Sequence, residues 1–213
     1  VFKIMFSFAI TPRFYETKID RLISVEQKYY PFFEKFNSIV NLIPFSSLSI
    51  EKYLDRAKPD GVIFAGGYRM YTEEIREFEY AVMKHSLDRK IPILAICCGM
   101  WTVNGYFNGT LKFNENHQAF VDDKIDIKKM IHFVKSKDLI EQGNYKVNSF
   151  HSKVIDKLGE NLNVFLEAHD GEIEGIYNLE KKIIGVQFHM ENSGVSGSLT
   201  RQIMNKFFGL IRR

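Results

Sequence analysis

The sequence predicts an α/β fold in which a mostly parallel sheet lies between two layers of helices. Short apolar runs alternate with amphipathic helical stretches through the first half of the chain, a rhythm typical of doubly wound sheets. The run at residues 91–96 is apolar almost throughout, as expected for a strand buried on both faces. With 213 residues and 45% hydrophobic content, the chain is expected to form a single domain spanning residues 1–213.

Strands in the first half are expected where short apolar runs occur, at residues 1–10, 39–43, 61–65 and 91–96. Helices are expected between them, at residues 24–36, 48–57 and 72–86. Ser24 is the expected N-cap of the first helix and Thr72 that of the third. Glu73 and Glu74 follow Thr72 in the first turn, where the helix dipole favours acidic side chains.

The second half predicts further strands at residues 146–150, 164–169, 172–177 and 183–188, followed by a closing helix at 198–211. Asp170 and Gly171 indicate a hairpin, because this pair readily adopts the positive φ angles of a tight turn. The polar stretch 114–142 shows no clear periodicity, and its role is not predicted.

Charge and composition argue against several classes of protein. A net charge of +3 with interspersed signs gives no reason to expect a nucleic-acid partner. No apolar run reaches the ~18 residues of a membrane span, and residues 1–10 fit a buried strand better than a signal peptide. Cys97 and Cys98 are adjacent, which does not suggest a disulfide framework, so a reducing cytoplasm is expected.

Cys97 is the candidate nucleophile. It ends the apolar run 91–96, Gly99 follows two residues later, and a helical pattern begins there, as in a nucleophile elbow. The amino end of that helix is expected to lower the pKa of the thiol. A buried structural cysteine would give the same local pattern, so a base and an orienting acid elsewhere in the chain must decide.

His189 and Glu191 supply these partners. His189 ends another predicted strand, and Glu191 follows two residues later. An imidazole can take the proton of a thiol and return it to a leaving nitrogen, while a carboxylate holds the imidazole in the required tautomer. General acid–base catalysis of this kind contributes roughly a hundred- to ten-thousandfold in rate.

Several segments resemble, in order, the motifs of the class I glutamine amidotransferase superfamily and its γ-glutamyl hydrolase branch. They correspond to the family patterns P-G-G, P-I-L-G-I-C-R-G-M-Q, N-S-F-H-H-Q, A-x-D-G-x-I-E and G-V-Q-x-H-P-E, and begin here at Ala65, Pro92, Asn148, Ala168 and Gly185. The resemblance implies a flavodoxin-like three-layer fold and a Cys97–His189–Glu191 triad. It also implies an oxyanion hole from the Cys98 amide and the Gly66–Gly67 turn, with no cofactor and no metal.

The implied substrate is a small γ-glutamyl amide, and its leaving group stays open because several family positions differ. Cys98, Trp101, Ser152, Lys153 and Met190 replace the family's Arg, Gln, His, Gln and Pro. Short length and these altered positions make the chain resemble the γ-glutamyl-CDP-amidate hydrolases of capsule phosphoramidate synthesis. The alternatives are a hydrolase of γ-glutamyl amines such as γ-glutamyl-aminobutyrate, a glutaminase subunit that feeds ammonia to a synthase, and a non-catalytic binding protein.

Candidate substrate contacts are drawn from two sources. Arginines and tyrosines near the expected carboxyl ends of strands could hold a diphosphate, since a guanidinium matches phosphate oxygens with two donors. The family's matching segment implies contacts with the glutamyl amino and carboxylate groups. The resulting set comprises Arg13, Tyr15, Tyr68, Arg69, Trp101, Asn148, Ser149 and His151. The sequence predicts no oligomeric state.

Overall fold

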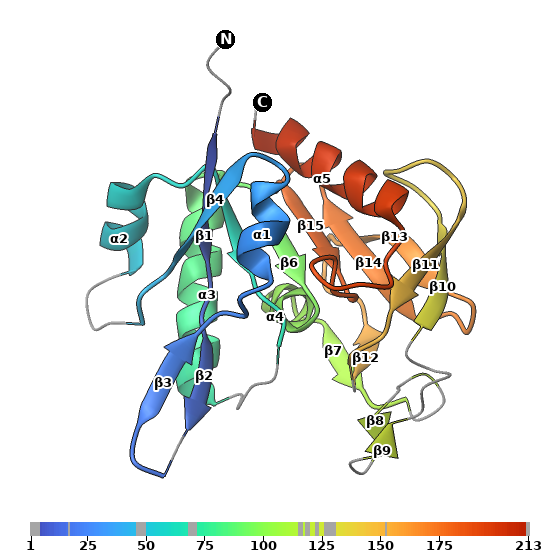
Figure 1. Ribbon diagram of the computed structural model, residues 1–213, viewed down its shortest axis with the longest axis horizontal. Helices are drawn as coiled ribbons and strands as arrows, with labels where there is room; N and C mark the ends of the chain where they lie inside the picture. Colours follow the sequence, from blue (N-terminus) through green and yellow to red (C-terminus); the bar gives the residue numbers. More distant parts are fainter. Residues whose placement is uncertain are drawn as a thin grey trace.

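The computed structural model describes residues 5–16, 18–45, 50–67, 72–114, 117, 120–121, 124–125, 131–151 and 153–211. Within these residues, nine strands form one sheet in the order β11-β10-β13-β14-β15-β6-β5-β1-β4 (Figure 1). The strands β14 and β10 run opposite to the other seven. The expected three-layer, mostly parallel α/β fold is therefore confirmed.

The strands of this sheet have the following bounds: β1 Phe6–Ile10, β4 Ser38–Leu42, β5 Gly61–Phe64, β6 Ile93–Ile96, β10 Ile131–Ser136, β11 Asn144–Asn148, β13 Asn163–Ala168, β14 Ile173–Asn178 and β15 Ile183–Val186. Three short two-stranded sheets lie outside it: β2 Arg13–Glu16 with β3 Arg21–Ser24, β7 Thr110–Lys112 with β12 Val154–Lys157, and β8 Phe120–Val121 with β9 Lys124–Ile125. The helices are α1 Tyr29–Glu34, α2 Ile50–Ala57, α3 Glu73–Asp88, α4 Cys98–Tyr106 and α5 Gly197–Ile211.

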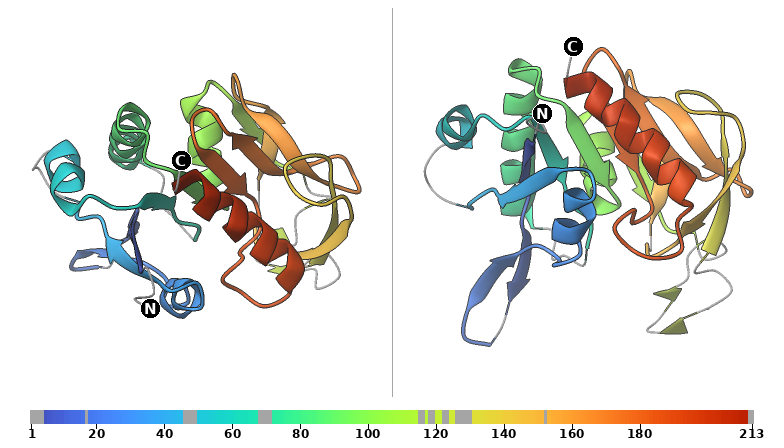
Figure 2. Two further views of the ribbon diagram at one scale, coloured as in Figure 1. Left: turned by 90° about the horizontal axis from the view of Figure 1, so that it is seen from above. Right: turned by 45° about the horizontal axis from the view of Figure 1, so that its top comes forward.

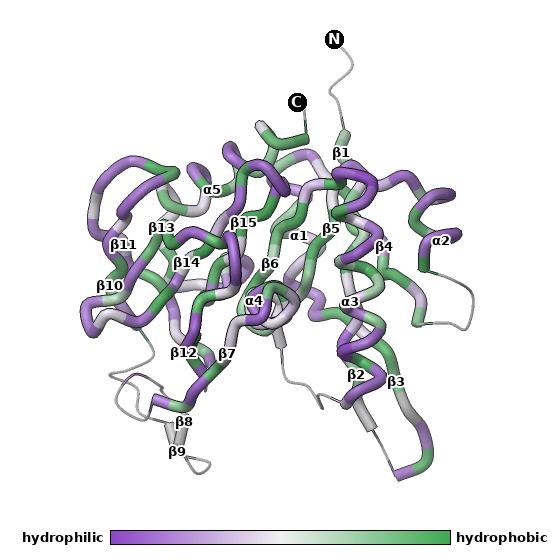
Figure 3. Tube along the Cα trace, turned by 180° about the vertical axis from the view of Figure 1, so that it is seen from behind, coloured by the Kyte–Doolittle hydropathy of each residue, from purple (hydrophilic) through white to green (hydrophobic). Residues whose placement is uncertain are grey.

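The helices cover both faces of the sheet (Figure 2). On one face, Phe33 of α1 and Phe207 of α5 pack with Ile63 and Leu94 of the central strands. On the other face, helices α2, α3 and α4 pack against alternate residues of the same strands, such as Val62. This alternation follows from the two-residue period of a strand, and it explains why β5 and β6 are apolar throughout (Figure 3).

Most expected elements of the first half are confirmed, including the Thr72 cap, whose hydroxyl accepts a hydrogen bond from the Ile75 amide. The helix expected at 24–36 is wrong in its first half. Residues 21–24 form β3, which pairs with β2 in a hairpin, and α1 begins only at Tyr29. Ser24 therefore caps no helix, and Lys28 occupies the N-cap position without a side-chain hydrogen bond.

The strands and closing helix of the second half lie where they were expected, within a few residues. β13 and β14 form the antiparallel hairpin at Asp170 and Gly171, and Gly171 has a φ of 88°. The polar stretch 114–142, for which no role was predicted, contributes β10 to the sheet. No helix among the described residues is long and apolar enough to cross a bilayer.

Parallel pairing of β15, β6 and β5 brings three chain segments to one edge of the sheet. Val186 is in register with Ile96, and Ala95 with Phe64. The residues that follow these strands therefore emerge side by side at the carboxyl edge, where open α/β sheets bind ligands. This edge carries residues 65–67, Cys97 and the segment 187–191.

Candidate active site

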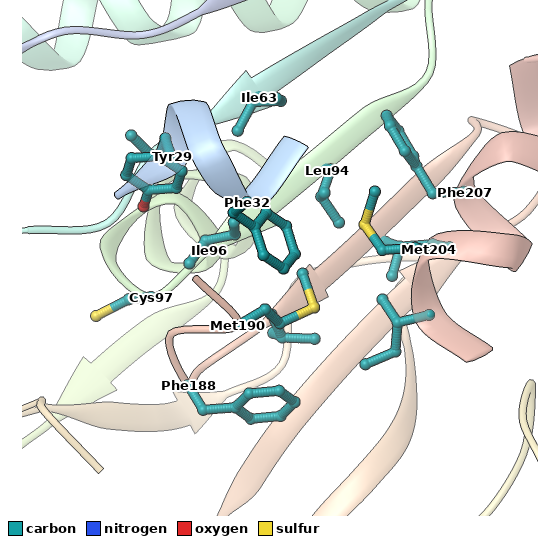
Figure 4. Close-up of a cluster of buried hydrophobic side chains, with 14 of the residues drawn as sticks. Tyr29, Phe32, Ile63, Leu94, Ile96, Cys97, Phe188, Met190, Met204 and Phe207 are labelled. Carbon is teal, nitrogen blue, oxygen red and sulfur yellow. The ribbon is translucent and has the colours of Figure 1, made fainter. Parts of the chain in front are cut away.

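Cys97 lies at the turn between β6 and α4. Its backbone has φ 52° and ψ −111°, an unfavourable conformation for a residue with a side chain and one that costs on the order of 1–3 kcal/mol. Figure 4 shows its sulfur turned away from the neighbouring core residues Phe32, Ile96 and Met190. Gly99 permits the turn, because a Cβ there would lie 2.1 Å from the carbonyl oxygen of Phe64. This is the geometry of a nucleophile elbow.

His189 and Glu191 form a hydrogen-bonded pair just beyond β15. The Nδ1 atom of His189 lies 2.5 Å from Oε1 of Glu191. Asn148 fixes the backbone of the histidine from both sides, because its Oδ1 accepts from the His189 amide at 2.9 Å and its Nδ2 donates to the His189 carbonyl at 2.8 Å. The imidazole is thus oriented with Nε2 on the side opposite the carboxylate.

Gly66 is the point where the imidazole and the nucleophile candidate meet. A Cβ built on Gly66 would lie 3.0 Å from Cβ of Cys97, 2.6 Å from Cε1 of His189 and 3.2 Å from its Nε2. The two side chains therefore border the same small space, which only a residue without a side chain leaves open. Three segments distant in sequence converge here.

The pKa values of the two groups indicate the resting protonation state. The pKa of Cys97 is raised well above its ordinary value by a hydrogen bond with the Cys98 thiol and by burial, although the Cys98 amide acts to lower it. The expectation of a lowered thiol pKa is therefore wrong for this state. Burial acts to lower the pKa of His189, but the hydrogen bond and charge of Glu191 raise it overall. A protonated thiol beside an imidazole requires proton transfer when the thiol attacks.

The Gly66–Gly67 turn is held by three side chains. The Gly66 amide donates to the hydroxyl of Tyr29 at 2.7 Å, and Nε of Arg13 donates to the Gly66 carbonyl at 3.0 Å. The Cys98 thiol donates to the Gly67 carbonyl at 3.3 Å. Since Tyr29 engages the Gly66 amide, Gly67, with a φ of 120°, offers the second amide of the turn.

Arg13 is not placed as an open phosphate contact. Its side chain is 2% exposed, and its NH1 atom lies 2.9 Å from Oε1 of Glu79, which is equally buried. Glu79 also accepts a hydrogen bond from Thr102 of α4 at 2.5 Å. Burial acts to lower the pKa of Arg13, but Glu79 raises it overall, so the guanidinium stays charged. The ion pair joins α3, α4 and the Gly66 carbonyl, which corrects the role expected from sequence.

The other expected contacts divide into three groups. Trp101 lies at the site, because its indole donates to Oε1 of Gln187 at 2.7 Å and Nε2 of Gln187 lies 3.7 Å from the Cys97 sulfur. Asn148 supports His189, and Ser149 is fully buried. Tyr68, Arg69 and the Tyr15 side chain lie outside the described residues.

Sequence reasoning missed several groups at this edge. Tyr29 and Gln187 had no recognised motif role, although Gln187 lies within the G-V-Q-x-H segment. Glu26 was also missed, and its Oε1 would lie 3.1 Å from a Cβ on Gly67. His151 lies among buried histidines around Glu174 that could hold a metal ion, and no such cluster was expected. The adjacent Cys97 and Cys98 are not joined by a disulfide.

Comparison with known proteins agrees with this arrangement. The family described as Peptidase C26 matches residues 13–191. The glutamine amidotransferase-like protein YvdE of Lactococcus lactis is 29% identical over 210 residues, which are 85% of this chain and 86% of the relative. The γ-glutamyl-CDP-amidate hydrolase of Campylobacter jejuni is 33% identical over 135 residues, covering 63% of this chain and 59% of that protein.

Solved structures share the fold. A GMP synthase component from Thermoplasma acidophilum superposes with a TM-score of 0.71 at 18% identity, covering 99% of this chain and 96% of the other. A glutamine amidotransferase from Thermotoga maritima gives 0.63 at 16% identity, covering 97% and 84%. The chain therefore belongs to the Peptidase C26 family, a class I glutamine amidotransferase-like family of C–N hydrolases.

Proposed function

We propose that this chain hydrolyses a γ-glutamyl amide bond, with Cys97 as nucleophile, His189 as base and Glu191 as the residue that orients it. The observation that carries this proposal is the convergence at Gly66, where the Cys97 and His189 side chains border one space. The strained backbone of Cys97 and the Glu191 hydrogen bond support the same assignment, since both are costly or specific features that a structural cysteine would not need.

In the first half-reaction, the Cys97 sulfur attacks the γ-carbonyl carbon while Nε2 of His189 takes the thiol proton. The developing oxyanion accepts hydrogen bonds from the amides of Cys98 and Gly67, and each such donor is worth roughly a hundred- to a thousandfold in rate. His189 then gives its proton to the leaving nitrogen, which departs and leaves a γ-glutamyl thioester. In the second half-reaction, the same imidazole takes a proton from water, water attacks the thioester, and glutamate leaves as the thiol is restored.

The turn that carries the Gly67 amide is built to hold still. Tyr29 and Arg13 bind the two polar atoms of the Gly66 peptide backbone, and Arg13 is itself fixed by Glu79. A donor that is already positioned needs no reorganisation as charge develops, which is what oxyanion stabilisation requires. We assign Tyr29 and Arg13 as positioning residues on this basis.

Glu26 is proposed to bind the α-ammonium of the glutamyl group. Its carboxylate faces the Gly67 position, and its charge contributes to the raised pKa of His189, so it lies at the mouth of the same space. A Glu26→Gln variant is expected to raise KM for every γ-glutamyl substrate with a smaller effect on kcat. An unchanged KM would remove Glu26 from the binding site.

The proposed leaving group is cytidine diphosphoramidate, released from γ-glutamyl-CDP-amidate in capsule phosphoramidate synthesis. The support is the similarity to the Campylobacter jejuni hydrolase, which covers 63% of this chain. Arg13 is unsuited to a diphosphate because it is buried and paired, so Arg69 becomes the proposed phosphate contact of the two.

The experiment is a panel of glutamine, γ-glutamyl amines, γ-glutamyl peptides and γ-glutamyl-CDP-amidate, scored by glutamate release from wild type and Cys97→Ala. We expect the nucleotide substrate to give the highest kcat/KM, and we expect Cys97→Ala to abolish release from all of them. A preference for simple γ-glutamyl amines would replace the substrate but keep the mechanism. Turnover by Cys97→Ala at the wild-type rate would reject the mechanism itself.

A further inference from the structure

Three histidines and a glutamate meet in a buried cluster one strand away from the candidate active site. His117, His132, His151 and Glu174 each direct one ligand-type atom to a common centre, and these atoms all lie within 4.8 Å of one another. The side chains of His117, His151 and Glu174 are at most 1% exposed, and that of His132 is 13% exposed. No sequence motif marks this cluster, because the four residues come from four separate segments.

Polar atoms of this cluster lack partners within the described part of the chain. Nδ1 of His132, Nε2 of His151 and Oε2 of Glu174 are buried and make no hydrogen bond there. Buried polar atoms in folded proteins are nearly always satisfied, so each such exception requires an explanation. Unsatisfied atoms on three side chains of one cluster indicate a missing common partner.

The outer contacts of two histidines define which nitrogen faces inward as an acceptor. Nδ1 of His151 lies 3.0 Å from the carbonyl oxygen of Lys153, and a carbonyl only accepts, so Nδ1 must carry a hydrogen. Nδ1 of His117 lies 2.6 Å from the carboxylate of Asp170, which gives the same result. In their neutral forms, both imidazoles therefore direct an Nε2 lone pair at the carboxylate of Glu174. Histidines that ligate metals are held in this way by carboxylates and carbonyls behind them.

The distances fit a cation between these lone pairs. Oε1 of Glu174 lies 3.1 Å from Nε2 of His117, 3.5 Å from Nε2 of His151 and 3.9 Å from Nδ1 of His132. Tetrahedral ligands with metal–nitrogen bonds of about 2.0–2.1 Å lie about 3.4 Å apart, near the middle of this range. Without a cation, lone pairs would face a carboxylate unless the histidines are doubly protonated.

We propose that His117, His132, His151 and Glu174 bind a divalent transition-metal ion of the zinc class. Three imidazole nitrogens and one carboxylate oxygen form a donor set suited to such ions, and four protein ligands in a buried position are typical of a structural site. The ion would tie together β10, β14, residue 117 and the segment after β11.

This site would also brace the candidate active site. The amide of Gln187 donates to the carbonyl of Glu174 at 2.9 Å, and Gln187 reaches the Cys97 sulfur with its side chain. His151 follows Asn148 by three residues, and Asn148 holds the backbone of His189. The proposal does not depend on the reaction, because metal binding can be measured without any substrate.

The test is the metal content of the full chain, purified without chelators and measured by inductively coupled plasma mass spectrometry. We expect about one zinc-class ion per chain. After the ion is removed with a chelator, Co²⁺ should bind to the same stoichiometry and give the visible d–d absorption of a four-coordinate site. The melting temperature should rise on adding back Zn²⁺, since an ion that binds only the folded state stabilises it.

His132→Gln is the informative variant, because it is the most exposed ligand and lies outside the catalytic machinery. It should lose at least tenfold in Co²⁺ affinity, whereas the control His169→Gln, an exposed histidine outside the cluster, should bind as wild type does. If His132→Gln does not fold, the metal-free and reloaded wild type decide the question alone. A folded wild type that contains no stoichiometric metal, and neither binds Co²⁺ nor gains stability with excess Zn²⁺, would overturn the proposal.

Discussion

Replacing Gly66 by alanine tests the convergence of the candidate triad by sterics alone. The Gly66 backbone is not in the left-handed region, so alanine can adopt its conformation and the only change is a methyl group. That methyl would lie 2.6 Å from Cε1 of His189, whereas carbon atoms in contact are about 3.5–4.0 Å apart. The imidazole must therefore move by about 1 Å. The Cys97 Cβ, at 3.0 Å, blocks an escape in its direction.

A displacement of this size should cost roughly a hundredfold in kcat/KM, which corresponds to about 2.7 kcal/mol of transition-state stabilisation. Overpacking should also cost about 1–3 kcal/mol of folding stability, which leaves the protein folded. The assay is glutamate release from the most active substrate of the panel, with circular dichroism to confirm folding. Gly209→Ala is the matched control, because a Cβ there meets no atom within 4 Å, and it should keep full activity. If Gly66→Ala stays within threefold of wild type, His189 and Cys97 do not meet at this position during turnover.

Three further changes probe the surroundings of the site. Glu191→Gln should lower kcat by roughly a thousandfold or more and move the acid limb of the kcat/KM–pH profile to lower pH, because the carboxylate is what raises the pKa of His189; an acid limb that moves to higher pH would contradict this. Tyr29→Phe should cost about 1–3 kcal/mol in chemical denaturation and reduce kcat, since it leaves a buried amide of the glycine turn without an acceptor, and unchanged stability would show that water replaces the hydroxyl. Glu79→Ala should cost about 3–5 kcal/mol by leaving Arg13 as an unpaired buried charge, whereas a loss below 1 kcal/mol would mean that the pair is not buried in solution.

The elements that sequence predicts well here are those whose burial is simple. The strand before Cys97 is apolar because both of its faces are covered, and the Thr72 helix has a side-chain cap and acidic first turn. The hairpin of β2 and β3 was missed because its residues carry no clear alternation, and Ser24 resembles a cap. The central strands could be placed from local pattern alone, whereas this arm could not.

The candidate triad could be named because each member closes a recognisable segment. The roles of Arg13 and Asn148 could not, because they depend on partners far away in the chain, Glu79 and the backbone of His189. The histidine cluster shows the same limit more strongly, since its ligands lie at positions 117, 132, 151 and 174 with no short spacing. Long-range pairing in the sheet creates that site, and pattern reading has no access to it.

The most direct test is to trap the covalent intermediate. Wild-type protein is mixed with its best γ-glutamyl substrate, quenched in acid during turnover, and digested for peptide mass spectrometry. The proposed mechanism predicts a glutamyl group in thioester linkage on Cys97, formed within the first turnover and absent from the adjacent Cys98. A glutamyl group on Cys98, or full turnover by Cys97→Ala with no adduct on any residue, would contradict it.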